Sequence, residues 1–227
     1  MKKYTIAFLL LIAIVLFGTS DSEAKLKYYK RASKAAKVLD EIMEAADSSI
    51  PQWCLDEAVG IIVIPSVKKG GLGLGGRYGR GLGCFRHPGD AWGPPVYFGI
   101  HGGSFGLQIG GQSIDVVLVV LNEGGVKSLL GDKVTLGVGA GAAAGPVGRN
   151  AEADTNLRMR AKILTYARSR GLFAGITLKG SVLQADGSAN RWAYGKKYET
   201  GDIVYSRKIQ PADATKIFLE RVQQYAP

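Results

Sequence analysis

The chain has 227 residues, a formal net charge of +10, 32 glycines and two cysteines. This length suits one domain, or two small ones, with a real hydrophobic core, and a hydrophobic content of 46% argues against disorder. Two cysteines exclude a disulfide-rich miniprotein and a four-cysteine zinc site, and glycine without a three-residue period excludes collagen. The positive charge favours anionic partners: nucleic acid, anionic lipid headgroups or acidic polymers.

The N-terminal segment has the layout of a secretory signal peptide. Lys2 and Lys3 precede an apolar run over 5–17, and a small, polar stretch ends at Ala24. We therefore predict a signal peptide over 1–24, cleavage near Ala24, and a periplasmic or otherwise extracytoplasmic protein. An uncleaved membrane anchor is the less favoured alternative, because a transmembrane helix needs about 20 apolar residues. Export also disfavours nucleic acid as a partner.

Residues 26–47 are predicted to form an amphipathic helix, since helix-forming residues dominate and glycine and proline are absent. Apolar residues such as Leu39 and Ile42 take one side, and acidic residues follow only from Asp40 onwards. The basic residues share the opposite side of the helical wheel. They are Lys27, Lys30, Arg31, Lys34 and Lys37. The N-terminal half of this helix is therefore cationic and amphipathic.

Cys54 and Cys84 admit two interpretations. In an oxidising compartment they can form a disulfide. Alternatively, each is buried as a separate thiol, since free cysteine packs as a small hydrophobe. The sequence leaves both open.

Beyond residue 50, short β-type runs alternate with glycine. Helical segments are predicted from Pro51 to Ala58, from the N-cap Asn122 to Leu130, and from Pro211 to Tyr225. The predicted strands cover 60–65, where Pro65 ends the strand, 70–83 as a glycine-rich bent strand, 96–100, 114–121, 133–139 and 171–183. This pattern favours a bent or barrel-like, mainly antiparallel β body with an N-terminal amphipathic helix and a C-terminal helix. The fold class is therefore α+β.

Residues 157–170 fit either a strand or a helix, and the strand is favoured. In a strand, one face is cationic, because successive side chains alternate between faces. That face contains Arg158, Arg160, Lys162, Arg168 and Arg170. In either conformation the segment is a second basic patch.

Three motifs resemble catalytic or ligand-binding signatures but lack their context. Residues 71–76 match G-x-G-x-x-G, yet no helix is predicted to follow, which a pyrophosphate site requires. Ser104 lies in G-x-S-x-G, but both histidines precede it, so no later histidine can activate it. Cys84 and His87 offer two metal ligands, with Asp90 as a third, but no second ligand cluster. We therefore predict a protein with no enzymatic activity, no metal and no cofactor.

Several motifs, in order along the chain, resemble those of the SYLF family, a lipid-binding domain also described as a yeast-type actin-binding module. The most specific are Gly145-Pro-Val-Gly-Arg149 and Ser169-Arg-Gly-Leu-Phe-Ala-Gly-Ile-Thr-Leu-Lys-Gly180. The others are Ala35–Leu39, Ala58–Pro65, Lys69–Gly71, Trp92–Pro94, Gly106–Gly110 and Asn190–Gly195. The resemblance covers about residues 30–225. It implies a single SYLF-type domain over 25–227 that binds anionic lipids, with an N-terminal amphipathic helix taking part.

Charge and resemblance together predict recognition of anionic phospholipid headgroups at a membrane surface. Leu26, Tyr28 and Tyr29 are expected to insert into the headgroup zone. The expected lipid-binding residues are Lys27, Lys30, Arg31, Lys34, Lys37, Arg149, Arg158, Arg160 and Lys162. The alternative is a cell-envelope interaction or scaffold protein that binds a protein partner or an acidic polymer. A further interpretation is that the helix packs on the β body and its lysines are only solvated.

Overall fold

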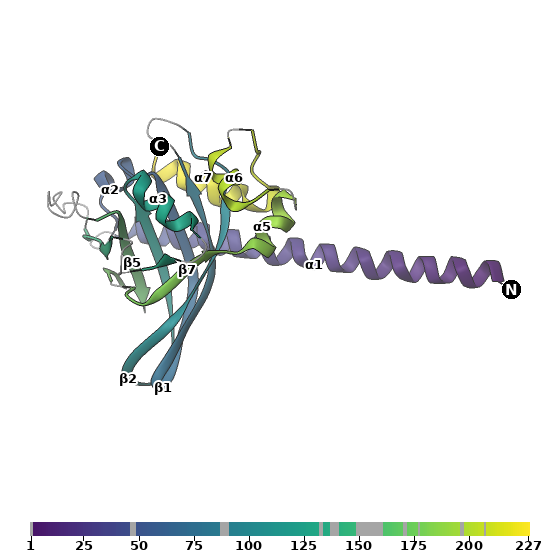
Figure 1. The fold of residues 1–227 in the computed structure, drawn as a ribbon, viewed down its shortest axis with the longest axis horizontal. Helices are drawn as coiled ribbons and strands as arrows, with labels where there is room; N and C mark the ends of the chain where they lie inside the picture. The colour runs from purple at the N-terminus through teal and green to yellow at the C-terminus, as the bar shows by residue number, and fades with distance from the viewer. Residues whose placement is uncertain are drawn as a thin grey trace.

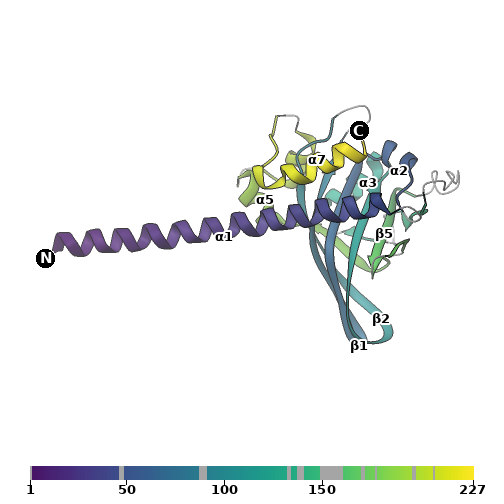
Figure 2. The same ribbon diagram turned by 180° about the vertical axis from the view of Figure 1, so that it is seen from behind.

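The computed structural model describes residues 2–45, 49–86, 91–131, 134–136, 141–148, 161–169, 172–176, 178–195, 198–206 and 208–227, with the backbone alone for 2–22, 71–74 and 104–111. Its first element is α1 (Lys2–Glu44), one continuous helix. The predicted helix over 26–47 is confirmed as far as Glu44, and positions 46 and 47 lie outside the described residues. The C-terminal part of α1 packs against the sheet and the C-terminal helix, while its N-terminal part extends beyond the body (Figures 1 and 2).

Two long antiparallel strands, β1 (Gly60–Phe85) and β2 (Val96–Val120), form the centre of the sheet. The prediction that Pro65 ends a strand is wrong, because β1 continues past it. Pro65 lies in a bulge, where the register shifts between Ile64 and Val67 and the missing N–H of proline is tolerated. The prediction of separate strands over 96–100 and 114–121 is also wrong. The glycines between them stay extended and pair with β1, most of them with its glycines.

Both strands bend where their glycines face each other, and β1 folds back over itself (Figure 1). The register shifts between Gly71 and Gly73, and the second half of β1 then returns across the first. A Cβ atom on Gly81 would lie 1.9 Å from the carbonyl oxygen of Val63, which no side chain can accommodate. The predicted glycine-rich bent strand over 70–83 is therefore confirmed as part of β1.

The remaining strands extend the sheet from both halves of β2. β7 (Ser181–Ala185) pairs with the first half of β2, and β5 (Ile163–Ser169) pairs with the second. β3 (Val134–Thr135) lies beside β7, while β4 (Ala142–Ala144) and β6 (Leu172–Gly175) lie along β5. All described pairings are antiparallel except that of β4 with β5. The sheet is a curled half-barrel, and the predicted α+β class is confirmed.

Two predicted strands are shorter than expected. The prediction over 171–183 is corrected to two strands, β6 and β7, because the chain turns before Ser181 at Gly180, which has a φ of 78°. The prediction over 133–139 is confirmed only for β3, with positions 133 and 137–139 outside the described residues.

Short helices connect the strands and end the chain. Asn122 is the predicted N-cap, and its side chain accepts a hydrogen bond from the Gly125 N–H at 3.0 Å. The helices confirmed from the sequence are α2 (Gln52–Asp56), α3 (Glu123–Leu130) and the C-terminal pair, the 3₁₀ turn η1 (Asp213–Thr215) and α7 (Lys216–Tyr225). Two further helices, α5 (Gly187–Tyr194) and α6 (Thr200–Tyr205), were not predicted.

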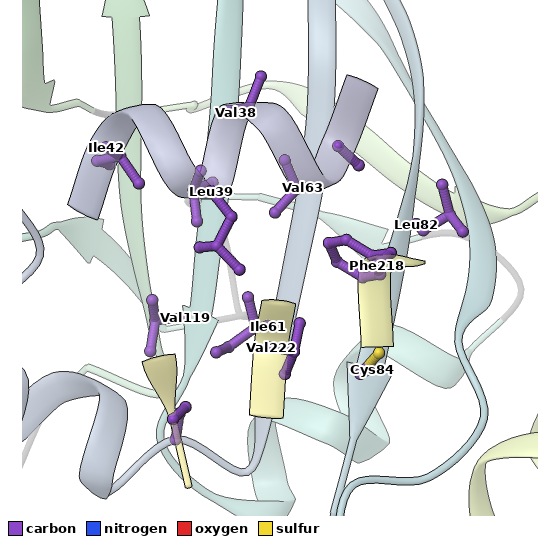
Figure 3. Close-up of a cluster of buried hydrophobic side chains, with 14 of the residues drawn as sticks. Val38, Leu39, Ile42, Ile61, Val63, Leu82, Cys84, Val119, Phe218 and Val222 are labelled. Atoms are coloured by element: carbon purple, nitrogen blue, oxygen red, sulfur yellow. The ribbon is translucent and has the colours of Figure 1, made fainter. Parts of the chain in front are cut away.

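Two hydrophobic cores lie on the two faces of the sheet. The inner core, inside the fold of β1 on itself, contains Ile62 and Ile64. The outer core contains their neighbours in sequence, Ile61 and Val63, because successive strand residues point to opposite faces. There α1 and α7 pack together on the sheet, and Figure 3 shows Leu39 of α1 above these strands.

Cys54 and Cys84 are free thiols, fully buried in the outer core. The structure therefore has the second of the two predicted alternatives, two separate buried thiols. Burial raises the pKa of the Cys84 thiol well above its ordinary value. The Tyr166 hydroxyl donates a hydrogen bond to the Cys54 Sγ at 3.5 Å.

The predicted strand within 157–170 is confirmed over 163–169, but its cationic face is not. Leu164 and Tyr166 share the face of Arg168 and are fully buried. Arg168 itself is paired with Asp115 at 2.7 Å and with Glu41. The strand is buried because β5 packs within the sheet and under α1. Arg158, Arg160 and Arg170 lie outside the described residues.

Candidate functional site: a basic groove between α1 and β1

A groove with a volume of about 540 Å³ lies between α1 and the two halves of β1. We call it the basic groove, because six of its lining residues are cationic. They are Lys27, Lys30, Arg31, Lys34, Lys68 and Arg80. Among the described residues that line it, Glu23 is the single acid. The groove therefore presents a strong positive charge to solvent.

The α1 wall contains three exposed lysines, Lys27, Lys30 and Lys34. Their spacing of three and four residues places them on one face of the helix. Within the described part of the chain, none of the three forms an ion pair. Three predicted lipid-binding residues thus gather in one groove with their charges not neutralised.

The β1 wall consists of Lys68 from the first half of the strand and Tyr78 and Arg80 from the second. All three are exposed, and the guanidinium carbon of Arg80 lies 5.5 Å from the centre of the Tyr78 ring. None of these three residues was predicted from the sequence as a binding residue. The sequence feature that could have indicated them is the run of glycines with basic residues on both sides. In the structure this run is the bend that brings the two halves of β1 together.

Arg31 lies between the walls and is only 9% exposed. Its guanidinium carbon is 5.3 Å from the centre of the Tyr28 ring and 5.2 Å from that of Tyr97. Its Nη1 donates a hydrogen bond to Asp186 Oδ2 at 3.0 Å. The prediction of Arg31 as a free lipid contact does not fit this position, because its charge is already paired. Arg31 holds α1 against the sheet.

Asp186 connects the two walls of the groove. Besides Arg31 of α1, it faces Arg80 of β1, with Nε and Oδ2 4.0 Å apart. It also caps α5, accepting hydrogen bonds from the Ala189 N–H and the Ser188 hydroxyl. Burial alone would raise the pKa of Asp186, but the hydrogen bonds from Ser188, Ala189 and Arg31 outweigh it and lower the pKa. The carboxylate is thus held in its charged form.

The three predicted membrane-inserting residues differ in exposure. Tyr28 is 9% exposed, with its ring centre 5.3 Å from that of Tyr97 and 4.5 Å from that of Trp192. Its predicted insertion does not fit this position, because the ring belongs to the outer core. Leu26 and Tyr29 are exposed, at 52% and 47%, and stay available for contact.

The other predicted basic residues lie outside the groove. Lys37 is exposed beyond it and faces Glu41, with Nζ and Oε1 3.9 Å apart. Lys162 is partly buried, with its side chain against Gly124 and Gly141. Arg149, Arg158 and Arg160 lie outside the described residues.

The structure places the weak catalytic motifs in strands. Ser104 lies within β2 and not at a strand-to-helix turn, and residues 71–76 lie within β1. In the described residues, no three metal-binding side chains gather in one place, and His87 and Asp90 fall outside them. No helix in the described part of the chain is both long and apolar enough to cross a bilayer.

The fold and the groove define an α+β protein with a curled sheet, α1 and α7 on its outer face and a strongly basic groove. Comparison with known proteins shows which family the chain belongs to. The chain belongs to the Ysc84 family, whose model, described as "Las17-binding protein actin regulator", matches residues 101–225. The resemblance to the SYLF family is thereby confirmed.

Curated relatives agree with the family match. SH3 domain-containing YSC84-like protein 1 of Rattus norvegicus is 37% identical over 193 residues, covering 82% of this chain and 56% of the relative. The Homo sapiens protein of the same name is 35% identical over the same shares of both chains. LAS seventeen-binding protein 3 of Saccharomyces cerevisiae is 32% identical over 206 residues, covering 86% of this chain and 44% of the relative. The chain spans about half the length of the relatives it matches.

Proposed function

We propose that this protein binds anionic phospholipid headgroups at a membrane surface through the basic groove. The observation that carries the proposal is the set of three exposed lysines on α1, which form no ion pair with the described residues and face Lys68 and Arg80 across the groove. Cations on two walls attract phosphate groups from both sides, whereas a solvated helix face offers one side only. The contacts by Lys27, Lys30 and Lys34 are part of this proposal.

The expected electrostatic contribution is large enough to matter. A basic residue near an anionic membrane surface contributes about 1 kcal/mol. Lys27, Lys30 and Lys34 together then contribute about 3 kcal/mol, roughly a hundredfold in affinity. Salt weakens this attraction, because the Debye length is only about 8 Å at physiological ionic strength.

Export and processing are also part of the proposal. Cleavage after Ala24 keeps every cation of the groove and removes Glu23, the single acid among its described lining residues. The processed protein then meets the outer surface of a membrane with a more positive groove. N-terminal sequencing of the protein purified from its host tests the cleavage, and an N-terminus at Met1 contradicts it.

Vesicle flotation tests the lipid contact. Vesicles of phosphatidylcholine with phosphatidylglycerol are expected to carry the protein to the top of the gradient, and vesicles of phosphatidylcholine alone are not. Changing Lys27, Lys30 and Lys34 to Gln should reduce binding roughly a hundredfold. The matched control changes three exposed lysines outside the groove, Lys127, Lys179 and Lys208, to Gln. Both variants lose the same net charge, so an equal loss of binding contradicts a site at the groove.

The second candidate function is binding of an acidic protein partner, in a scaffold or interaction role. The family description and the name of the yeast relative, which refer to Las17 binding, favour it. Failure of the wild-type protein to bind either kind of vesicle, together with capture of an acidic protein that depends on Lys27, Lys30 and Lys34, supports this candidate over the first.

A further inference from the structure

Exposed apolar side chains gather beside the basic groove. The described residues include six large apolar side chains that are exposed: Leu26, Tyr29, Tyr78, Val147, Leu172 and Tyr205. Two of these, Leu26 and Tyr78, line the basic groove. Tyr29 lies one turn of α1 from Leu26 and lines a second groove that shares Leu26. Three of these six side chains therefore lie in one small part of the surface.

Leu26 and Tyr78 lie on opposite walls of the groove. Leu26 comes from α1 and is 52% exposed, and Tyr78 comes from the second half of β1 and is 51% exposed. Cations stand next to both: Lys27 and Lys30 on the α1 wall, and Arg80 over the Tyr78 ring. The groove thus has an apolar group and positive charge on each wall.

The second groove continues the apolar surface along α1. It has a volume of about 470 Å³ and is lined by Lys25, Leu26, Tyr29, Asp213 and Ala214. Leu26 separates it from the basic groove, because it lines both. A contact surface that contains Leu26 therefore includes Tyr29 on one side and the lysines on the other.

This arrangement matches the layers of a membrane surface. Phosphate groups lie beside the boundary of the acyl chains, and tyrosine is suited to that boundary, because its ring is apolar and its hydroxyl is polar. Apolar side chains at such a surface enter the boundary while neighbouring lysines and arginines stay with the phosphates. A single amphipathic helix would bring only Leu26 and Tyr29 to this depth.

We propose that β1 enters the membrane surface together with α1, with Tyr78 as its inserting residue opposite Leu26. This proposal rests on the proposed function and deepens it. The partner is a bilayer that contacts both α1 and β1, with headgroup phosphates bound between the two elements. Arg80 and Lys68 contact phosphates from the β1 side. The position of Tyr78 depends on the fold of β1 back over itself, so this contact requires the folded sheet.

Site-specific labelling tests the proposal directly. Cys54 and Cys84 are fully buried, so a thiol-reactive, environment-sensitive fluorophore should react with an introduced surface cysteine in the folded protein. The variants are Tyr78→Cys, Leu26→Cys and, as a control, Tyr205→Cys, which is 42% exposed and lines a different pocket. With phosphatidylcholine–phosphatidylglycerol vesicles, the labels at positions 78 and 26 should brighten and be quenched by spin-labelled lipid, and the label at 205 should not.

The outcomes separate this inference from the proposed function. If the wild-type protein does not bind these vesicles, the proposed function fails and the inference with it. If it binds and only the label at 26 enters the lipid, α1 acts alone and the role of β1 is overturned. Equal responses at 78 and 205 also overturn it.

A second measurement avoids the label. Tyr78→Ala should reduce vesicle binding several-fold with the lysines intact, while Tyr78→Phe should retain most of it, because the ring is kept. An acidic peptide in free solution provides the comparison for a protein partner. If Tyr78→Ala weakens binding of the peptide but not of the vesicles, the groove serves a protein and the inference is overturned. Unchanged circular dichroism verifies that each variant is folded.

Discussion

Two faces of α1 have opposite environments, although both belong to one continuous helix. One face, with Leu39 and Ile42, is fully buried against the sheet and α7. The other, with Lys27, Lys30 and Lys34, is exposed and forms no ion pair with the described residues. The first face determines where the helix lies, and the second is thereby held at the edge of β1. The helix is therefore part of the folded protein, and its packing fixes the position of the proposed binding surface.

Arg31 marks the boundary between the two faces. It is as basic as its neighbours, but its guanidinium is buried between two tyrosine rings and paired with Asp186. Charge alone therefore does not show which residues of this helix are available for binding. Lys30 is the neighbour of Arg31 in sequence, and a rotation of about 100° around the helix axis separates the buried residue from the exposed one.

The largest change in the free energy of unfolding is expected from a substitution on the buried face of α1. Leu39→Ala should lower the free energy of unfolding by about 2–5 kcal/mol, because it leaves a cavity in the outer core. Chemical denaturation measures the change. Lys34→Ala on the exposed face is the control and should change stability by no more than about 0.5 kcal/mol. Similar losses in both variants would contradict the assignment of the two faces.

A second prediction tests the boundary at Arg31. Arg31→Met should lower the free energy of unfolding by about 3 kcal/mol, since it leaves Asp186 without its buried partner. Lys30→Met, one residue away on the same helix, should change stability by no more than about 0.5 kcal/mol. If Arg31→Met leaves the free energy of unfolding unchanged, the proposed stabilising role of Arg31 is contradicted.

Acid should weaken the same contact. The pKa of Asp186 is lowered in the folded protein, so its charged form contributes stability above the unfolded pKa of about 4, and that contribution is lost as pH falls through the lower, folded pKa. The difference in unfolding free energy between wild type and Asp186→Asn should therefore narrow as pH falls from 7 to below 4. The exposed Glu220→Gln serves as a control, and its difference should stay nearly constant. A constant difference for Asp186→Asn would show that its charge does not matter to folding.

The smallest effects are expected from single lysine substitutions. They test how far the proposed lipid-contact surface extends along α1. Lys30→Gln should weaken vesicle binding about fivefold, the equivalent of about 1 kcal/mol. Lys37→Gln should weaken it less, because Lys37 lies beyond the groove and faces Glu41 at 3.9 Å. Titration with vesicles that contain phosphatidylglycerol compares the two, and equal losses would extend the site along α1 past the groove.

Much of the fold could be predicted from local pattern. The periodicity of 26–47 predicted the C-terminal part of α1, and Asn122 predicted the start of α3, because helix periodicity and capping depend on neighbours in sequence. Strand ends were less predictable. Pro65 usually ends a strand, yet here it lies in a bulge whose position depends on the pairing of β1 with β2.

The candidate site could be predicted only in part, for a related reason. The α1 wall follows from helical spacing, which brings Lys27, Lys30 and Lys34 together without any other element. The β1 wall requires a strand to fold back on itself, so that Lys68 and Arg80 lie beside the same helix. No local sequence pattern predicts which part of α1 will pack beside the folded-back strand β1.

By itself, the sequence determined the family, the α+β class, the basic charge and the amphipathic helix that carries much of the charge. Those properties depend on composition, on short motifs and on spacing along the chain. The tertiary structure determines which of these side chains are accessible. It buries Arg31 and Tyr28 and leaves the neighbouring lysines exposed. It also added Tyr78 and Arg80 as a second wall. The physical reason is that burial and ion pairing depend on what packs against a side chain, and here those partners come from β1, β2 and α5, far along the chain.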